Sequence, residues 1–243
     1  MDIDPGYRQR PAFTEHLGKH RQYWRDIILG VNDGLVSMFL LVAGVVGGGM
    51  ATRDVLLTGV AGAIAGAVSM AAGEYMATKS QDEVFQGEIE LEREHIRDFK
   101  EDELHELRDL FGGIGLEGDL REQVVQHFSN DEEALLGVMT ALEFGVLENE
   151  RRSALAAAAM SGVLFLLGSL PSVVPFAIVE TPNAGLIAAA IGAVLGLLVV
   201  GAIKTWATRG RPLRAAAENL LIAGLGGGLA YWVGIGFDRI VNG

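Results

Sequence analysis

Acidic side chains stand inside the first two apolar segments of this sequence, where charge is costly. Asp33 lies within the apolar segment 27–49, and Asp26, seven residues earlier and directly before that segment, shares its helix face. A carboxylate in lipid costs about 3 kcal/mol and by default marks a path for ions or substrate. For Asp33 two other roles stay open, an ion pair with a neighbouring helix and a cap on a helix break at residues 32–34.

The second apolar segment, residues 55–77, adds a thioether and another carboxylate. Met70 and Glu74 are four residues apart and share a helix face. Span two returns toward the side that span one leaves, so Glu74 is expected at a depth similar to that of Asp33. Oxygen ligands suit Mn²⁺ and Fe²⁺, and a thioether favours softer metals. We therefore predict a metal path along Asp26, Asp33, Met70 and Glu74. The alternatives are packing for Met70 and a position at the interface beside Lys79 for Glu74.

Most of the acidity lies between the second and third apolar segments. Residues 80–152 hold 21 Asp and Glu against 7 Lys and Arg, while the whole 243-residue chain has a net charge of −12. Apolar spacing predicts one helix over residues 80–111. On that helix the acids and a histidine fall on one edge, and the bases fall on the other flank. The side chains on the acidic edge are Glu88, Glu92, His95, Glu103 and Glu106.

Two more helices are expected in this acidic insert. Glycines at 112, 113 and 115 end the first helix, a short helix follows over residues 117–128, and a third begins at a Ser129–Asn130 cap and runs through Glu150 into the next span. On the third helix Met139 and Glu143 share a face. Three helices that carry Glu, His and Met predict a carboxylate-rich site for divalent metals. The alternative is a solvated acidic face, which is the usual role of a charge run.

Five apolar blocks must position these side chains. They cover residues 27–49, 55–77, 154–178, 184–206 and 215–237, each long enough to cross a bilayer. The sequence therefore predicts an all-α membrane protein with five transmembrane helices and a three-helix cytoplasmic metal-binding insert between spans two and three. The domains expected are an amphipathic N-terminal segment (1–26), spans one and two (27–79), the insert (80–152) and spans three to five (153–243).

Loop charges predict the orientation and exclude some partners. Lys and Arg gather at residues 8–25, 79, 151–152 and 204–214, while the opposite loops hold only Arg53 and Arg239. The positive-inside rule then places the N-terminus and the insert in the cytoplasm. The acidic charge argues against nucleic acid as a partner. Because no targeting signal is recognisable, we expect a prokaryotic plasma membrane, with a vacuolar membrane as the alternative.

Two classes of function remain after these observations. The sequence has no cysteine, no nucleotide-binding loop and no HExxH motif, so an enzyme is not expected. The leading hypothesis from the residues alone is a membrane path for divalent transition metals, at whose carboxylates metal and proton would compete. The alternative is a membrane-anchored module that binds or senses divalent metal without transport.

Two motifs resemble a known family. The segments DGLVSMFLLVAGV (33–45) and GAVSMAAGEYMATKSQ (66–81), with an acidic three-helix insert after two spans and before three, resemble the vacuolar iron transporter family. The resemblance covers about residues 20–237. It implies a homodimer of five-span protomers that exports Fe²⁺, and often Mn²⁺, Co²⁺ or Zn²⁺, in exchange for protons. It implies a path at or near the dimer interface and no permanently bound cofactor.

The resemblance also assigns roles to residues. Asp33 and Met70 match the family's path residues, with Glu74 close by in the same motif. The insert side chains that match its metal-binding pattern are Glu92, Glu103, Glu106, Met139 and Glu143. The sequence departs from the pattern at two positions: His95 stands where a second Glu is expected, and Thr140 replaces a second Met.

Overall fold

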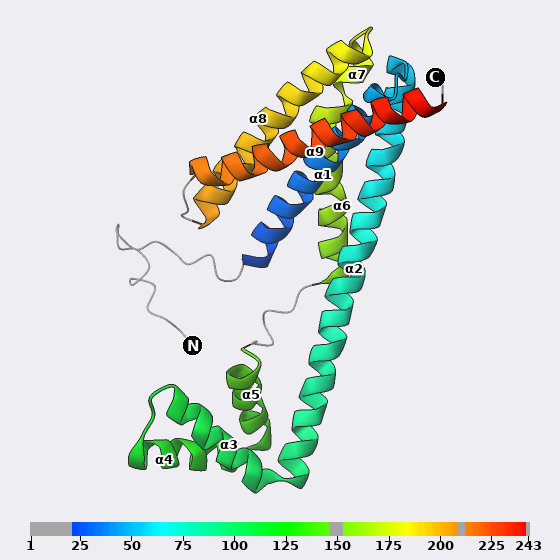
Figure 1. Ribbon diagram of the computed structural model, residues 1–243. Helices are drawn as coiled ribbons and strands as arrows, with labels where there is room; N and C mark the ends of the chain where they lie inside the picture. Colours follow the sequence, from blue (N-terminus) through cyan, green and yellow to red (C-terminus); the bar gives the residue numbers. More distant parts are fainter. Residues whose placement is uncertain (1–20, 146–152, 209–211, 242–243) are drawn as a thin grey trace, which may run out of the picture. The chain divides into compact units, whose positions relative to one another are not determined.

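The described part of the chain folds into helices (Figure 1). A computed structural model describes residues 21–145, 153–208 and 212–241, and all regular structure in those ranges is helical. The helices are α1 (Arg21–Gly47), α2 (Thr52–Asp98), α3 (Lys100–Gly113), α4 (Gly118–Ser129), α5 (Glu132–Glu143), α6 (Ala154–Val173), α7 (Pro175–Ile178), α8 (Pro182–Thr208) and α9 (Pro212–Val241).

Five of these helices are long and apolar enough to cross a membrane. They are α1, α2, α6, α8 and α9, so the prediction of an all-α membrane protein with five spans is confirmed. The third span is shorter than expected. It was predicted to reach residue 178, but α6 ends at Val173 and Pro175 begins the separate helix α7. Proline has no N–H to continue a helix and is well suited to a first helical position.

Helix α1 runs without a break through the positions where a break was considered. It is helical from Arg21 to Gly47, so Asp33 does not cap an interrupted helix. Residues 21–26 also belong to α1, although they were expected in a separate amphipathic segment. Residues 1–20 of that segment lie outside the part of the chain that the structure describes.

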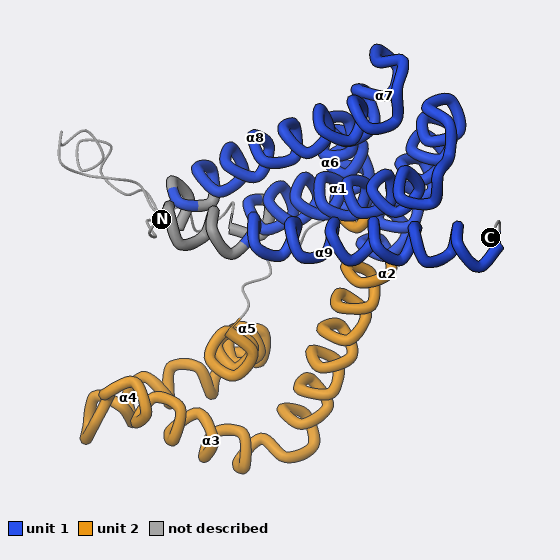
Figure 2. Tube along the Cα trace, turned by 45° about the horizontal axis from the view of Figure 1, so that its top comes forward, with its two compact units in different colours: residues 1–75, 155–243 blue, residues 76–154 orange. Residues whose placement is uncertain are grey.

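The chain divides into two compact units (Figure 2). We call residues 1–75 with 155–243 the membrane unit, and residues 76–154 the insert unit. Helix α2 contributes to both, because it continues unbroken past the boundary expected between residues 79 and 80. The exact domain boundaries given above stay a prediction.

Within the membrane unit, α1 packs against α6 at backbone distance. A Cβ added to Gly34 would overlap with the carbonyl of Phe165, and one added to Gly168 would overlap with the carbonyl of Val31. The hydroxyl of Ser172 donates to the carbonyl of Leu35 at 3.2 Å. Gly34 is therefore a residue of close helix contact, which small side chains make possible in membranes.

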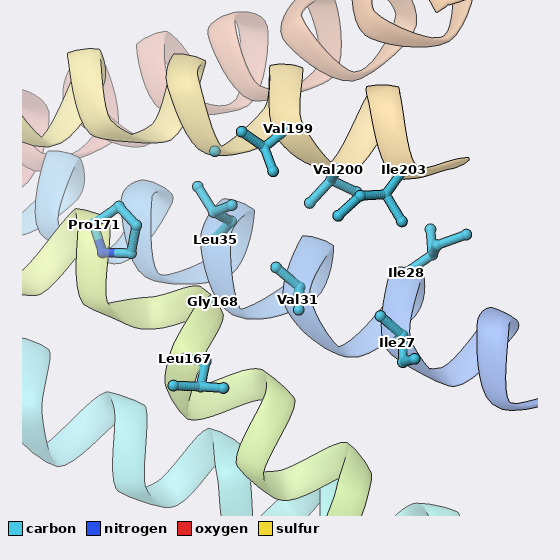
Figure 3. A pocket seen from close by; sticks show the side chains of 11 residues that line it. Ile27, Ile28, Val31, Leu35, Leu167, Gly168, Pro171, Val199, Val200 and Ile203 are labelled. Carbon is cyan, nitrogen blue, oxygen red and sulfur yellow. The ribbon is translucent and has the colours of Figure 1, made fainter. Parts of the chain in front are cut away.

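An apolar cavity of about 220 Å³ lies beside α1, between α6 and α8 (Figure 3). From α1 it is lined by Ile27, Ile28, Val31 and Leu35. At 100° per residue, Asp26 and Asp33 fall on the opposite side of the helix. The two acids of span one thus point away from the apolar wall that faces α6 and α8.

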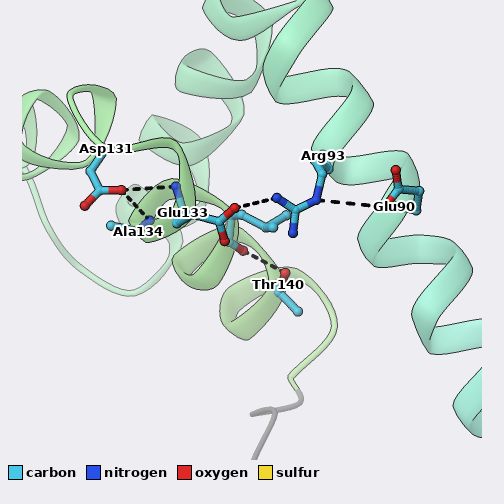
Figure 4. Close-up of polar contacts among 7 residues, drawn as sticks. Glu90, Arg93, Asp131, Glu133, Ala134 and Thr140 are labelled. Atoms are coloured by element: carbon cyan, nitrogen blue, oxygen red, sulfur yellow. Dashed lines mark hydrogen bonds and ion pairs between the residues drawn. The ribbon is translucent and has the colours of Figure 1, made fainter.

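The insert unit has its own apolar core. Leu107, Leu135 and Met139 are fully buried there. The predicted second helix is confirmed as α4, but the third differs from its prediction: it begins after Asp131, whose carboxylate accepts from the N–H groups of Glu133 and Ala134 at 3.1 Å each (Figure 4).

The side chains expected to cap the third helix close the preceding one instead. Ser129 and Asn130 both donate to the carbonyl of Gln126 near the end of α4. At its other end α5 stops at Glu143, and Gly145 has a φ of 64°. The third helix therefore does not continue into the next span, because glycine at such a left-handed position is a common helix terminator.

Candidate metal centre and membrane path

The acidic edge of the insert is divided between two helices. One helix was expected over residues 80–111, but α2 ends at Asp98 and α3 begins at Lys100. Phe99 joins them with φ −134° and ψ 36°, and its carbonyl accepts from the N–H of Glu103 at 3.2 Å. On an unbroken helix Glu92 and Glu103 would be about 16 Å apart along the axis. The turn at Phe99 is what brings them together.

Glu92, His95 and Glu103 form a compact group of metal-binding atoms. One ligand atom from each lies within 4.8 Å of the others, and Nδ1 of His95 is 3.4 Å from Oε1 of Glu103. Both glutamates are buried. Among the described residues, Oε1 of Glu92 and Oε2 of Glu103 have no hydrogen-bond partner. Buried carboxylate oxygens are normally satisfied, so these two have free capacity for a cation. Carboxylate and imidazole together suit Fe²⁺, Mn²⁺ and Zn²⁺.

The pKa values of the cluster reflect crowding of negative charge. Burial, and then the charges of Glu103 and Glu143, raise the pKa of Glu92 to about 7. Burial and the charge of Glu106 raise the pKa of Glu103. The charge of His95 lowers it and so opposes part of that rise. Each of these carboxylates is thus easier to protonate than an ordinary glutamate, because its charged form is poorly solvated and repelled by neighbours.

The remaining predicted glutamates also lie near this group. Partial burial, followed by the charges of Glu106, Glu103 and Glu88, raises the pKa of Glu143. The structure therefore gathers the five carboxylates and the histidine that the sequence placed on the acidic edge and on α5. Their role as metal ligands stays a prediction.

The methionine expected at the site is found in the apolar core. Met139 is fully buried among the residues that include Leu107 and Leu135. The hydroxyl of Thr140 donates to the carbonyl of Leu136 at 2.7 Å, one turn earlier in its own helix. Packing and local hydrogen bonding thus account for what the structure shows of these two side chains.

Several bases of the insert pair with acids on other helices. Arg93 contacts Glu133 of α5 (Figure 4), and Nε of Arg108 lies 3.0 Å from Glu122 of α4. Among the described residues, no Lys or Arg forms a salt bridge with any of the five clustered glutamates. Those five are Glu88, Glu92, Glu103, Glu106 and Glu143. Because the described Lys and Arg side chains pair with other acids, the five clustered glutamates stay available to an external cation.

In the membrane unit, the predicted path residues fall into two places. Asp26 is buried at the start of span one, and Arg25 links it to Glu74: Nε of Arg25 is 3.4 Å from Asp26, and Nη2 is 3.5 Å from Glu74. Asp33 is exposed on the surface of the unit, about 12 Å further along α1 than Arg25. The expected depth match of Glu74 is therefore with Asp26 rather than with Asp33.

The contacts of Met70 and Lys79 bear on the alternative roles considered for Met70 and Glu74. Met70 packs against the apolar cluster that contains Met38 and Phe165, as the packing alternative expected. Lys79 pairs with Glu83 at 3.6 Å rather than with Glu74.

Sequence reasoning missed Arg25 as a partner of both acids, because it was counted only among the loop charges. Its position directly before Asp26, at the start of an apolar span, was the available signal.

Comparison with known proteins places these features in a family. The model of the VIT family matches residues 24–235. Vacuolar iron transporter 2 of Oryza sativa subsp. japonica is 31% identical over 227 residues, which are 92% of each chain. Vacuolar iron transporter 1 of Arabidopsis thaliana is 30% identical over 95% of this chain and 93% of its own. Protein CCC1 of Saccharomyces cerevisiae is 27% identical over 85% of this chain and 66% of its own.

Proposed function

The chain belongs to the VIT family, and from that premise we propose that it exports Fe²⁺ from the cytosol in exchange for protons. Mn²⁺, Co²⁺ and Zn²⁺ are further expected cargoes. The family is one of transporters, not of enzymes, and its relatives are named vacuolar iron transporters. The observation that carries the proposal is the buried group of Glu92, His95 and Glu103, with carboxylate oxygens that no Lys or Arg of the described residues neutralises.

The insert is the proposed site of metal capture. Three oxygen or nitrogen donors from two helices lie close enough to bind one ion, and Glu88, Glu106 and Glu143 add negative charge around them. The pKa of Glu92, about 7, lies near the pH of cytosol. Metal binding at this position would release a proton, because a ligating carboxylate must be deprotonated.

The membrane path is proposed to use Asp26, Glu74, Met70 and Asp33. Asp26 and Glu74 stand at one end of spans one and two, and Asp33 lies deeper in span one. Because Asp33 is exposed on a single chain, a second protomer that covers it would remove a carboxylate from lipid. This favours a homodimer with Asp33 at or near the interface.

The orientation and host membrane also belong to the proposal. The protein is a multi-pass membrane protein, and the loop charges favour a cytoplasmic insert. We propose the plasma membrane of a prokaryote, with the vacuolar membrane of the relatives' names as the alternative. Export from the cytosol follows from a cytoplasmic site of capture.

Flux measurements in liposomes test the proposal. Purified full-length protein would be compared with Asp33→Ala and with a Glu103→Gln/Glu106→Gln double variant, using Fe²⁺ and Mn²⁺ under an imposed pH gradient. We expect wild-type metal flux to be coupled to proton flux, to be lost in Asp33→Ala, and to need higher metal concentrations in the double variant. A matched control, Glu101→Gln/Asp109→Asn, removes the same charge from exposed positions of α3.

The outcomes separate the two classes of function. Undiminished flux in Asp33→Ala would contradict the membrane path. Absence of flux in wild type, with metal bound by the insert, would instead favour a membrane-anchored binding module. Equal losses in the double variant and its control would show that total charge, and not the clustered glutamates, governs capture.

A further inference from the structure

The apolar cavity beside α1 reaches the surface of the membrane unit (Figure 3). Its lining includes Leu35 and Val200, which are 1% and 4% exposed, and also Leu167 and Val199, which are 54% and 59% exposed. Every residue that lines it is aliphatic, proline or glycine. Side chains around an empty space lack contacts on one side, so an apolar molecule that enters this cavity gains contacts with all its walls.

The length and volume of the cavity fit one tail of a membrane lipid. Along α1 the lining runs from Ile27 to Leu35, which is about 12 Å. One leaflet contributes about half of the 30 Å hydrocarbon core of a bilayer, so the cavity extends along most of one leaflet. Its volume of about 220 Å³ exceeds that of an apolar cavity of about 150 Å³ that binds benzene. Several methylene groups therefore fit inside.

The cavity and Asp33 are on opposite sides of α1. At 100° per residue, Ile27, Val31 and Leu35 point away from Asp33. The homodimer proposed above covers Asp33, so the cavity stays on a side of the membrane unit that faces the bilayer. The apolar molecule that surrounds a span in the bilayer is a lipid tail, and we take it as the occupant in place of a second copy of the chain.

Positive charge in the sequence gathers at the end of the cavity that Ile27 and Ile203 line. Ile203 belongs to the lining, and the residues that follow it, 204–214, include four Lys and Arg and no Asp or Glu. Basic clusters directly beside a membrane span attract the headgroups of anionic lipids. A lipid with its tail in the cavity and its headgroup at this end would therefore be favoured when the headgroup is negative.

We propose that the cavity between α1, α6 and α8 binds one tail of an anionic phospholipid. The tail fills the space between the buried Leu35 and Val200 and the exposed Leu167 and Val199, and so completes the packing of α1 against α6 and α8. The phosphate of the headgroup lies at the basic end, where the positive charge of residues 204–214 selects it over a neutral headgroup.

Native mass spectrometry of the full-length protein in detergent measures this binding directly. Delipidated protein would be titrated with phosphatidylglycerol, and separately with phosphatidylcholine that has the same tails. We expect phosphatidylglycerol to bind about fivefold more tightly, which is the contribution of one Lys or Arg beside an anionic lipid. Raised salt should reduce this preference, because it screens the charges. Phosphatidylglycerol should also raise the melting temperature, since a ligand of the folded state stabilises it.

Substitutions on α8 locate the bound tail. Val200→Phe enlarges a buried side chain of the lining, so its ring takes up space in the cavity. The affinity for phosphatidylglycerol should fall about tenfold or more, because the tail loses contacts with the walls, and the lipid should no longer raise the melting temperature. Val194→Phe is the matched control, since Val194 is 42% exposed on the same helix and is not part of the lining. Val199→Phe narrows the cavity from its exposed side and replaces Val200→Phe if that variant does not fold.

Three results would overturn the assignment. If Val200→Phe, or Val199→Phe in its place, binds phosphatidylglycerol as tightly as Val194→Phe does, the lipid binds elsewhere on the surface. Equal affinities for the two lipids would contradict the anionic headgroup. A changed oligomeric state of Val200→Phe with unchanged lipid binding would make the cavity a contact between copies of the chain. Lipid binding is measured without metal, so a failure to transport Fe²⁺ would contradict the proposed function and leave the lipid site standing.

Discussion

Several glycines of the membrane unit lie against the backbone of a facing helix, whereas, among the described residues, none of the glycines of the insert unit does. In the membrane unit, Gly34 and Gly168 lie where any side chain would overlap with the backbone of the facing helix. In the insert unit, a Cβ added to Gly137 would meet open space beyond its own helix backbone, and large buried side chains such as Leu107 fill the core instead. Lipid offers helices no hydrophobic gain from association, so close backbone packing takes its place. Water drives the insert to bury large apolar groups.

The strongest test of this comparison is Gly34→Ala. The added methyl group would overlap with the carbonyl of Phe165, which is backbone and cannot rotate away. Helix α1 would have to move off α6, and the hydrogen bond from Ser172 to Leu35 would break with it. We expect no folded protein in detergent, measured as loss of the monodisperse peak in size-exclusion chromatography.

The matched control for that variant is Gly73→Ala in the same unit. Gly73 lies in the middle of α2 with nothing within 4 Å of an added Cβ. Yield and elution volume should match the wild type. Equal damage from both substitutions would mean that glycine in a membrane helix matters for its backbone alone and not for its contact with a neighbour.

A core substitution in the insert should have the next largest effect. Leu107→Ala removes a fully buried side chain from the insert core, and such truncations cost about 2–5 kcal/mol. Hydrogen exchange of the intact protein should show faster exchange of amides in α3 and α5, while those in α1 and α8 keep their rates. Faster exchange throughout would contradict the separation of the two units.

The sequence predicted the parts of this comparison that depend on composition and length. Five apolar blocks defined five spans because about 20 apolar residues suffice to cross a bilayer. The acidic edge of the insert was also recognisable, because charged residues sort by helical face. The angular positions of Glu92 and Glu103, at 100° per residue, placed both on the same helix edge, and the structure brings them together.

The sequence did not predict the features that depend on contacts between helices. No glycine or proline marks the turn at Phe99, and the apolar spacing continues through it, so one helix was expected where there are two. The role of Gly34 depends on Phe165 in a helix about 130 residues later in the chain, and the link from Arg25 to Glu74 crosses from α1 to α2. Local patterns carry no information about such partners.

The insert should respond to pH in a way that follows from its buried acids. The pKa of Glu92 is raised from 4.5 to about 7 by burial and by neighbouring carboxylates. Below pH 7 a metal must displace a proton from it, so Mn²⁺ affinity should rise about tenfold per pH unit, and level off above pH 7. Titration calorimetry of the full-length protein at several pH values measures this slope.

The sign of the stability change is opposite to that of the affinity change. Between pH 4.5 and about 7 the folded insert keeps a proton on Glu92 that an unfolded chain has lost, so the metal-free insert becomes less stable as pH rises through this window. Glu92→Gln should flatten both dependences. The control Glu94→Gln, at an exposed position of α2, should leave them as in wild type, and a flat wild-type profile would contradict the assignment.

The smallest expected effect separates backbone conformation from packing. Gly137 lies inside α5 with open space around it, so Gly137→Ala should stabilise the insert by about 0.5–1 kcal/mol through helix propensity. Gly145 also has open space, but its φ of 64° is unfavourable for alanine, so Gly145→Ala should destabilise the insert by about 1 kcal/mol. Opposite changes in hydrogen-exchange protection of α5 would show that, in the insert, the backbone conformation of a glycine determines whether its replacement by alanine stabilises or destabilises the unit. If both substitutions changed stability in the same direction, contacts and not backbone conformation would have to act at Gly137 or Gly145. The insert glycines would then not differ in kind from Gly34.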